Sequence, residues 1–173
     1  MHITSLIIAD SRPLIDLALA DELDTLLTLA PKMQVLIPDM VRHDLMSRIE
    51  QFGVPDALEW IRVNEGEGVW VQSTQEMEEF IVLGCPAGKG RTRTRNELAA
   101  AELLGREQLR QVEAIILLLD DASIGHAPFL KALPDNVVLL STSGYLQKLK
   151  SRRMRPVVGA LLQRFMARGR SHA

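Results

Sequence analysis

Several things are scarce in this chain, and each scarcity removes a class of protein. Cys85 is the single cysteine among 173 residues, which excludes a disulfide framework within the chain and fits a reducing compartment. No apolar run approaches the roughly 20 residues needed to span a bilayer. The first residues lack the basic region of a signal peptide. We therefore expect a cytoplasmic protein. Aromatic residues make up 4%, so base stacking is not an obvious source of nucleic-acid specificity.

Acidic residues are absent after Asp135, and the two halves of the chain differ in net charge. Residues 1–88 carry a net charge of −10 and residues 89–173 one of +8, although the whole chain is at −2. A basic half on a mildly acidic protein suggests a polyanionic partner such as nucleic acid. The other interpretation is a set of solvated helices rich in Lys and Arg.

Short apolar stretches alternate with helical patterns along the chain. The stretches that predict strands are residues 3–9, 35–37, 69–71, 114–119 and 137–140. We expect a helix over residues 122–133, which either tolerates Pro128 or is broken by it, and two more helices near residues 144–150 and 157–167. Strands that alternate with helices predict a three-layer α/β/α domain with a central, mostly parallel sheet. The length suits one domain over residues 1–173.

Residues 85–95 have an irregular composition, which predicts a loop. Asn96 is a good N-cap for the helix expected after it. Arg91, Arg93 and Arg95 alternate with threonine, so an extended backbone would point all three to one side. These arginines could line a path for nucleic acid. A solvated loop is the alternative interpretation.

Carboxylates occur at places where one site could gather them. Asp10 follows the first strand, and Asp120 and Asp121 follow the most apolar strand. The carboxyl ends of parallel strands share one edge of a sheet, which is where ligands bind in open α/β folds. Asp44 lies on the helix after the second strand, and Glu97 lies in the first turn of a later helix. Helix capping by Asp10 and complementation of a helix dipole by Glu97 are the structural alternatives.

Carboxylates that gather in one place repel one another unless cations lie between them. Oxygen-rich acidic sites suit Mg²⁺ or Mn²⁺, which keep several waters and bind phosphates. The pattern therefore indicates a possible divalent-metal site.

Six stretches of the chain, in order, resemble a known family. Residues 7–17 (Ile-Ile-Ala-Asp-Ser-Arg-Pro-Leu-Ile-Asp-Leu) and 35–45 (Val-Leu-Ile-Pro-Asp-Met-Val-Arg-His-Asp-Leu) resemble the opening of a PIN-domain nuclease. Residues 96–104 resemble the family's Gly-Glu-led helix, and residues 117–124 its later acidic strand end. Residues 137–146 and 154–162 resemble the closing strand and helices of its prokaryotic branch. Residues 53–95 are the least alike.

The resemblance implies a set of metal ligands. Asp10 is then the first ligand, and Asp44 stands where the family has a Glu that is one methylene longer. Glu97 is the third acid. Asp120 or Asp121 is the fourth, and the family's patterns allow either.

Other positions depart from the family or support the site. Asn96 replaces the family's common Gly. Ser11 matches a position where a hydroxyl supports the site. Arg12 is unusual there and could touch phosphate or pair with an acid.

What the resemblance implies for function is a Mg²⁺- or Mn²⁺-dependent endoribonuclease. Such proteins are often toxins of toxin–antitoxin or plasmid-stability operons, so a small antitoxin-like partner and a homo-oligomer are expected. A PIN-like module that binds nucleic acid or protein without catalysis is the alternative, because positions 44 and 96 depart from the pattern.

Overall fold

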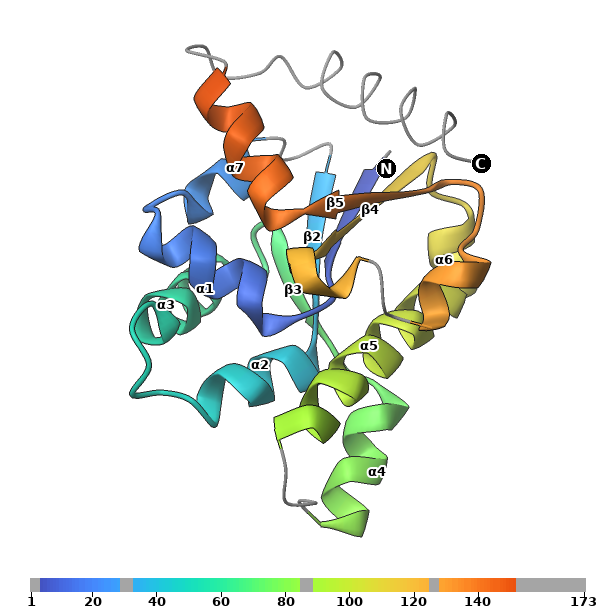
Figure 1. The fold of residues 1–173 in the computed structure, drawn as a ribbon. Coiled ribbons are helices and arrows are strands. Elements are labelled where there is room, and N and C mark those ends of the chain that lie inside the picture. The colour runs from blue at the N-terminus through green and yellow to red at the C-terminus, as the bar shows by residue number, and fades with distance from the viewer. Residues whose placement is uncertain (1–3, 29–32, 85–88, 125–127, 152–173) are drawn as a thin grey trace.

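The computed structural model describes residues 4–28, 33–84, 89–124 and 128–151. Its centre is a five-stranded sheet with the strand order β3-β2-β1-β4-β5, in which every pair of neighbours is parallel (Figure 1). The strands are β1 (Thr4–Ile8), β2 (Met33–Pro38), β3 (Val69–Gln72), β4 (Ala114–Leu119) and β5 (Val137–Ser141). Each strand that the sequence predicts is present, and the sheet is fully rather than mostly parallel.

The two faces of the sheet are covered by different helices. Leu6 and Ile8 of β1 pack on one face, against α1 (Ser11–Leu19), η1 (Leu23–Leu27) and α3 (Val54–Asn64). Ile7 between them packs on the other, against α5 (Lys89–Gly105) and α6 (Glu107–Arg110). Successive side chains of a strand point to opposite faces, so a continuous apolar run fills both. The predicted three-layer α/β/α architecture is confirmed.

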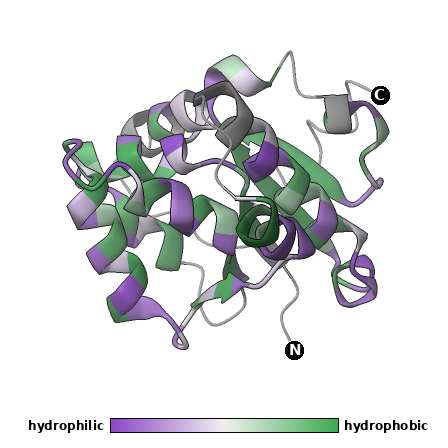
Figure 2. Cartoon of the chain, turned by 90° about the horizontal axis from the view of Figure 1, so that it is seen from below, coloured by the Kyte–Doolittle hydropathy of each residue, from purple (hydrophilic) through white to green (hydrophobic). Residues whose placement is uncertain are grey.

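The carboxyl ends of β2 and β3 point toward the bottom of the molecule in Figure 1, where α2 (Asp39–Met46), α4 (Gln75–Leu83) and the beginning of α5 lie. These three helices share a small apolar cluster of Met40, Phe80 and Ala99. Figure 2 views the molecule from below and shows green, hydrophobic strands beneath helices of mixed character. Among the described residues, no helix is long and apolar enough to cross a membrane.

Two predictions made from sequence are wrong in this region. Residues 89–95 are not an extended loop but the first turns of α5, and Asn96 is inside that helix rather than its N-cap. The prediction that Arg91, Arg93 and Arg95 point to one side required an extended backbone. Alternate residues of a helix do not face one side, so this prediction no longer holds. Contacts with α4, which no local pattern reveals, support the added turns.

The described elements after β4 agree with the expectations from sequence. The region of the helix expected over residues 122–133 contains two short 3₁₀ segments, η2 (Asp121–Ser123) and η3 (Pro128–Ala132), which agrees with the alternative in which the helix is broken. Pro128 has no N–H to donate to a continuous helix, and it begins the second segment. Helix α7 (Thr142–Ser151) corresponds to the helix expected near residues 144–150. The helix expected near residues 157–167 lies outside the described residues, as do residues 85–88.

Candidate functional site

The strand order places two of the predicted acids after neighbouring strands. β1 pairs with β4 so that Ile8 is opposite Leu118, and the Ala9 N–H donates to the Leu118 carbonyl over 3.1 Å. Asp10 and Asp120 follow the carboxyl ends of these two neighbouring strands. The chain runs from β1 to β2 on one side and returns to β4 on the other, so the topological switch point lies between the strands that these two acids follow. Ligands of open parallel sheets bind at such a point.

Asp10 serves as the N-cap of α1. Its backbone is extended, and its Oδ1 accepts a hydrogen bond of 2.7 Å from the N–H of Ser11. The side chain is buried, with 7% of the residue exposed. The helix N-terminus stabilises the negative charge there. The Asp10 carboxylate therefore caps a helix and also lies at the switch point, so the two interpretations of this residue do not exclude each other.

Asp44 reaches Asp10 through the hydroxyl of Ser11 and the amide of Asn96. The Ser11 Oγ donates to Asp44 Oδ2. The Nδ2 of Asn96 lies 3.4 Å from Asp10 Oδ1 and 3.3 Å from Asp44 Oδ2. Asp44 is buried because it borders the inward stripe of α2 that includes Val41. Although an aspartate is one methylene shorter than a glutamate, the Asp44 carboxylate reaches Ser11 and Asn96 at the end of β1.

Asn96 projects to this pair because of the way α5 packs. Its neighbours Ala99, Ala100 and Leu103 are fully buried, which fixes the rotation of the helix about its axis. Asn96 itself is fully buried, and its Oδ1 has no hydrogen-bond partner among the described residues. The sequence pointed to Glu97 instead. Glu97 is half-buried, and successive helical residues point in different directions.

Arg48 is a member of the site that sequence reasoning missed. Its Nη2 donates to Asp44 Oδ2, with which it forms an ion pair, and to Ser11 Oγ. Arg48 follows Asp44 by four residues, which is the spacing of ion pairs on one helix face. That spacing is the signal that could have identified it. The site as described thus holds two carboxylates, an amide and a guanidinium.

The two acids after β4 have different surroundings. Asp120 is half-buried at the N-cap position of η2. Asp121 is exposed, and both the N–H (3.2 Å) and the hydroxyl of Ser143 donate to its carboxylate. Partial burial opposes the ionisation of Asp121, but these hydrogen bonds outweigh it and lower its pKa. Asp121 therefore connects β4 to α7, whereas Asp120 borders the switch point.

Asp16 adds a carboxylate at this edge that the sequence did not single out. Burial raises the pKa of Asp16, and the negative charges of Asp120 and Asp121 raise it further. Arg12, which lies 2.9 Å from Asp16 and opposes this shift, is half-exposed. The unusual Arg12 thus pairs with an acid, which is one of the two roles that the sequence left open.

The donor set suits a hard divalent cation in its chemistry but is not arranged around one. Carboxylate oxygens and a buried, unpaired amide oxygen are ligands that Mg²⁺ and Mn²⁺ accept. Within the described part of the chain, no group of three or more His, Cys, Asp or Glu residues has metal-binding geometry. Asp10 and Asp44 are therefore brought together, while Glu97, Asp120 and Asp121 do not complete a four-acid cluster with them.

Arg95 is the described member of the predicted arginine path. Its Nη1 lies 2.7 Å from Glu76 Oε1, and its guanidinium lies 5.2 Å from the ring centre of Phe80. Both contacts are with α4. The side chains of Arg91 and Arg93 lie outside the described residues.

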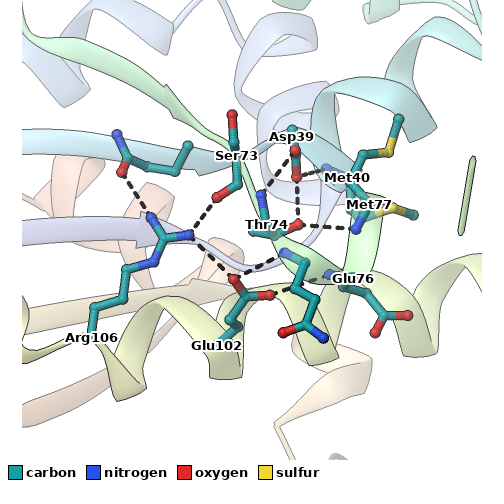
Figure 3. Close-up of polar contacts among 10 residues, drawn as sticks. Asp39, Met40, Ser73, Thr74, Glu76, Met77, Glu102 and Arg106 are labelled. Atoms are coloured by element: carbon teal, nitrogen blue, oxygen red, sulfur yellow. Dashed lines mark hydrogen bonds and ion pairs between the residues drawn. The ribbon is translucent and has the colours of Figure 1, made fainter. Parts of the chain in front are cut away.

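A polar junction next to the acid pair fixes α4 in place (Figure 3). Thr74 caps α4 by accepting from the Met77 N–H, and its own hydroxyl donates to Asp39 Oδ1 over 2.6 Å. Glu102 of α5 accepts from two further N–H groups of the first turn of α4, at 3.1 and 3.3 Å, and also contacts Arg106. These bonds satisfy donors that every helix start leaves unpaired. They hold α4 against α5.

No family model matches this chain, and no curated protein shows significant sequence similarity to it.

Proposed function

We propose that this chain is a PIN-like, Mg²⁺- or Mn²⁺-dependent endoribonuclease. The observation that supports it best is the buried pair of Asp10 and Asp44 at the topological switch point of a parallel sheet. Burying two carboxylates together is costly unless cations or hydrogen-bond donors compensate them, so their retention suggests a role in binding. The basic second half of the sequence suits a polyanionic substrate.

In this proposal Asp10 and Asp44 hold the cation, and the hydroxyl of Ser11 keeps the Asp44 carboxylate oriented. The bound cation supplies Lewis acidity toward the scissile phosphate and lowers the pKa of an attacking water. Asp120, which follows the neighbouring strand β4, would accept a proton or a hydrogen bond from that water. A helix N-terminus at Ser11 adds positive potential.

The biological context follows from the same family resemblance. A toxin or plasmid-stability nuclease needs restraint, so we propose a small antitoxin-like protein as partner and a homo-oligomeric assembly. RNA is the proposed substrate.

A PIN-like binding module without catalysis is the second candidate, and one observation favours it. The guanidinium of Arg48 already neutralises Asp44, as a cation would. A site whose acids are compensated internally has less need of metal. Under this alternative the fold binds nucleic acid or protein without cleaving it.

Cleavage of a mixed RNA pool by the purified chain, measured with and without Mn²⁺, distinguishes the nuclease from the binding module. We expect cleavage that requires the metal, and a loss of roughly 100-fold or more in Asp10→Asn, since even groups behind the ligands matter 10–100-fold. Asp56→Asn removes the same charge from an exposed position on α3 and should cleave like the wild type. Thermal melting should show Asp10→Asn intact or slightly stabilised, because repulsion is relieved. Metal-independent or absent cleavage supports the binding module.

A further inference from the structure

Only the nitrogen of the Asn96 side-chain amide has hydrogen-bond partners among the described residues. Its Nδ2 approaches both carboxylates of the acid pair, but its Oδ1 is buried without a partner among the described residues. Buried polar atoms are nearly always hydrogen-bonded, so an unpaired one in the middle of a polar site calls for an explanation. No hydrogen bond from a described residue to the oxygen therefore holds the amide in this orientation, so the amide can turn.

Arg48 shows that the same place favours a positive charge. Its guanidinium contacts Asp44 Oδ2 and the hydroxyl of Ser11, while about a third of its side chain, 36%, remains exposed. Its Nε is buried and also lacks a partner in the part of the chain that is described. The Arg48 side chain is therefore only partly satisfied, and it has a route to solvent along which it could withdraw.

Turning the Asn96 amide by half a rotation exchanges its oxygen and nitrogen with almost no change of shape. The Oδ1 would then lie about 3.3–3.4 Å from Asp44 Oδ2 and Asp10 Oδ1, where Nδ2 lies now. Oxygens on adjacent corners of an octahedral Mg²⁺ site are about 3 Å apart, because the bonds of 2.0–2.1 Å meet at right angles. Without a cation, the turned Oδ1 would be repelled by both carboxylate oxygens. The turned amide therefore requires a cation.

We propose that Asn96 is a ligand of the divalent cation together with Asp10 and Asp44, and that the Arg48 guanidinium holds the cation's place until it binds. This inference rests on the proposed metal-dependent function and adds two residues to it. Binding replaces one cation by another at Asp44, so the acid pair is compensated in both states. The turned amide supplies the neutral oxygen that the two carboxylates need as a third donor.

Mn²⁺ titration of the full chain, followed by the EPR signal of free Mn²⁺, tests the proposal without reference to cleavage. Arg48→Gln removes the competing cation and should lower the Kd about tenfold. Arg42→Gln is the matched control, because Arg42 lies on α2, shortly before Arg48 in the chain, but pairs with Glu65 over 3.5 Å. That control should change the Kd less than twofold.

Substitution of Asn96 gives the second half of the test. Asn96→Leu keeps the size of the side chain but loses its oxygen, and should raise the Kd about tenfold or more. Asn96→Asp should melt below the wild type without metal, because three carboxylates then repel, and should gain more in melting temperature from Mn²⁺ than the wild type does. Asn64→Asp makes the same charge change on α3, where Asn64 bonds the Trp60 carbonyl, and should show no such metal-dependent gain.

The outcomes separate this inference from the proposed function. Wild-type Mn²⁺ affinity in both Arg48→Gln and Asn96→Leu would overturn the inference, while metal-dependent RNA cleavage would leave the proposed function standing. The expected shifts in Kd without any RNA cleavage would support the inference and overturn the nuclease proposal. If Asn96→Leu does not fold, Asn96→Asp and Arg48→Gln decide. Absence of Mn²⁺ binding to every folded variant contradicts both.

Discussion

The Nη1 of Arg95 lies 2.7 Å from Glu76 Oε1, in an ion pair whose side chains are only 18% and 15% exposed. The guanidinium also lies over the ring of Phe80, 5.2 Å from its centre. Arg95 therefore joins α5 to α4, next to the site. Charge-assisted bonds of this kind are costly to break when one partner stays buried.

Arg95→Gln should lower the free energy of unfolding by about 2 kcal/mol, because Glu76 loses its partner and Phe80 its cation. Urea denaturation measures the change. Arg62→Gln is the control, because its pair with Glu59 is largely exposed, at 72% and 60%, and its loss should change the free energy of unfolding little. An equal decrease in the free energy of unfolding of the two variants would show that the Arg95–Glu76 pair stabilises the fold no more than an exposed pair does.

A role of Arg91 and Arg93 in nucleic-acid binding stays a prediction, and Arg95 is left out of it because Arg95 pairs with Glu76. If both contact phosphates, the double substitution to Gln should weaken RNA binding whatever its sequence. It should also flatten the salt slope by roughly 1.4, at about 0.7 for each phosphate of a single strand. RNA affinity measured at several salt concentrations checks this. A slope identical to that of the wild type would assign the segment to a protein partner instead.

Asp16→Asn should stabilise the protein at neutral pH by roughly a few tenths of a kcal/mol. Burial and the charges of Asp120 and Asp121 raise the pKa of Asp16 above its ordinary value of 3.8. The raised pKa means that ionisation costs stability. This cost is absent below pH 3.8 and grows until the pH exceeds the folded-state pKa. The gain is small because the variant also loses the Arg12 pair.

Urea denaturation at pH 7 and at progressively lower pH tests the sign for Asp16. The stabilisation should shrink as the pH approaches 3.8. Glu50→Gln, at an exposed position, should show no such trend. A stabilisation that grows toward low pH would contradict the argument.

Gly53→Ala should destabilise the fold by about 2 kcal/mol or more. Gly53 precedes α3 with a φ of +86°, and an added Cβ would lie 3.0 Å from Leu19 Cγ and 3.1 Å from the Ile15 carbonyl oxygen. Gly66 is the control, since its φ of +92° is similar but no atom lies within 4 Å of the added Cβ. Gly66→Ala should cost only the backbone strain of roughly 1–2 kcal/mol. Thermal and urea unfolding measure the loss of stability in both variants. The difference between the two losses gives the cost of the contacts of the added Cβ with Leu19 and Ile15, apart from the cost of backbone strain.

The sequence by itself determined the sheet and the position of its first acids. A parallel strand covered on both faces must be apolar throughout, so residues 3–9 and 114–119 were recognisable. The carboxylates that follow them necessarily lie at one edge once the strands are parallel. Asp10 and Asp120 could therefore be expected at one edge of the sheet, although only the strand order showed that the strands they follow are neighbours.

The tertiary structure alone decided which helical side chains reach this edge. A helix turns by about 100° for each residue, so the residue that faces a site depends on how the whole helix is packed. The burial of Ala99 and Ala100 turns Asn96 toward Asp10 and Asp44, and the contacts of Arg95 with α4 extend the helix back beyond its expected start. These are long-range contacts, and no spacing within residues 85–105 encodes them.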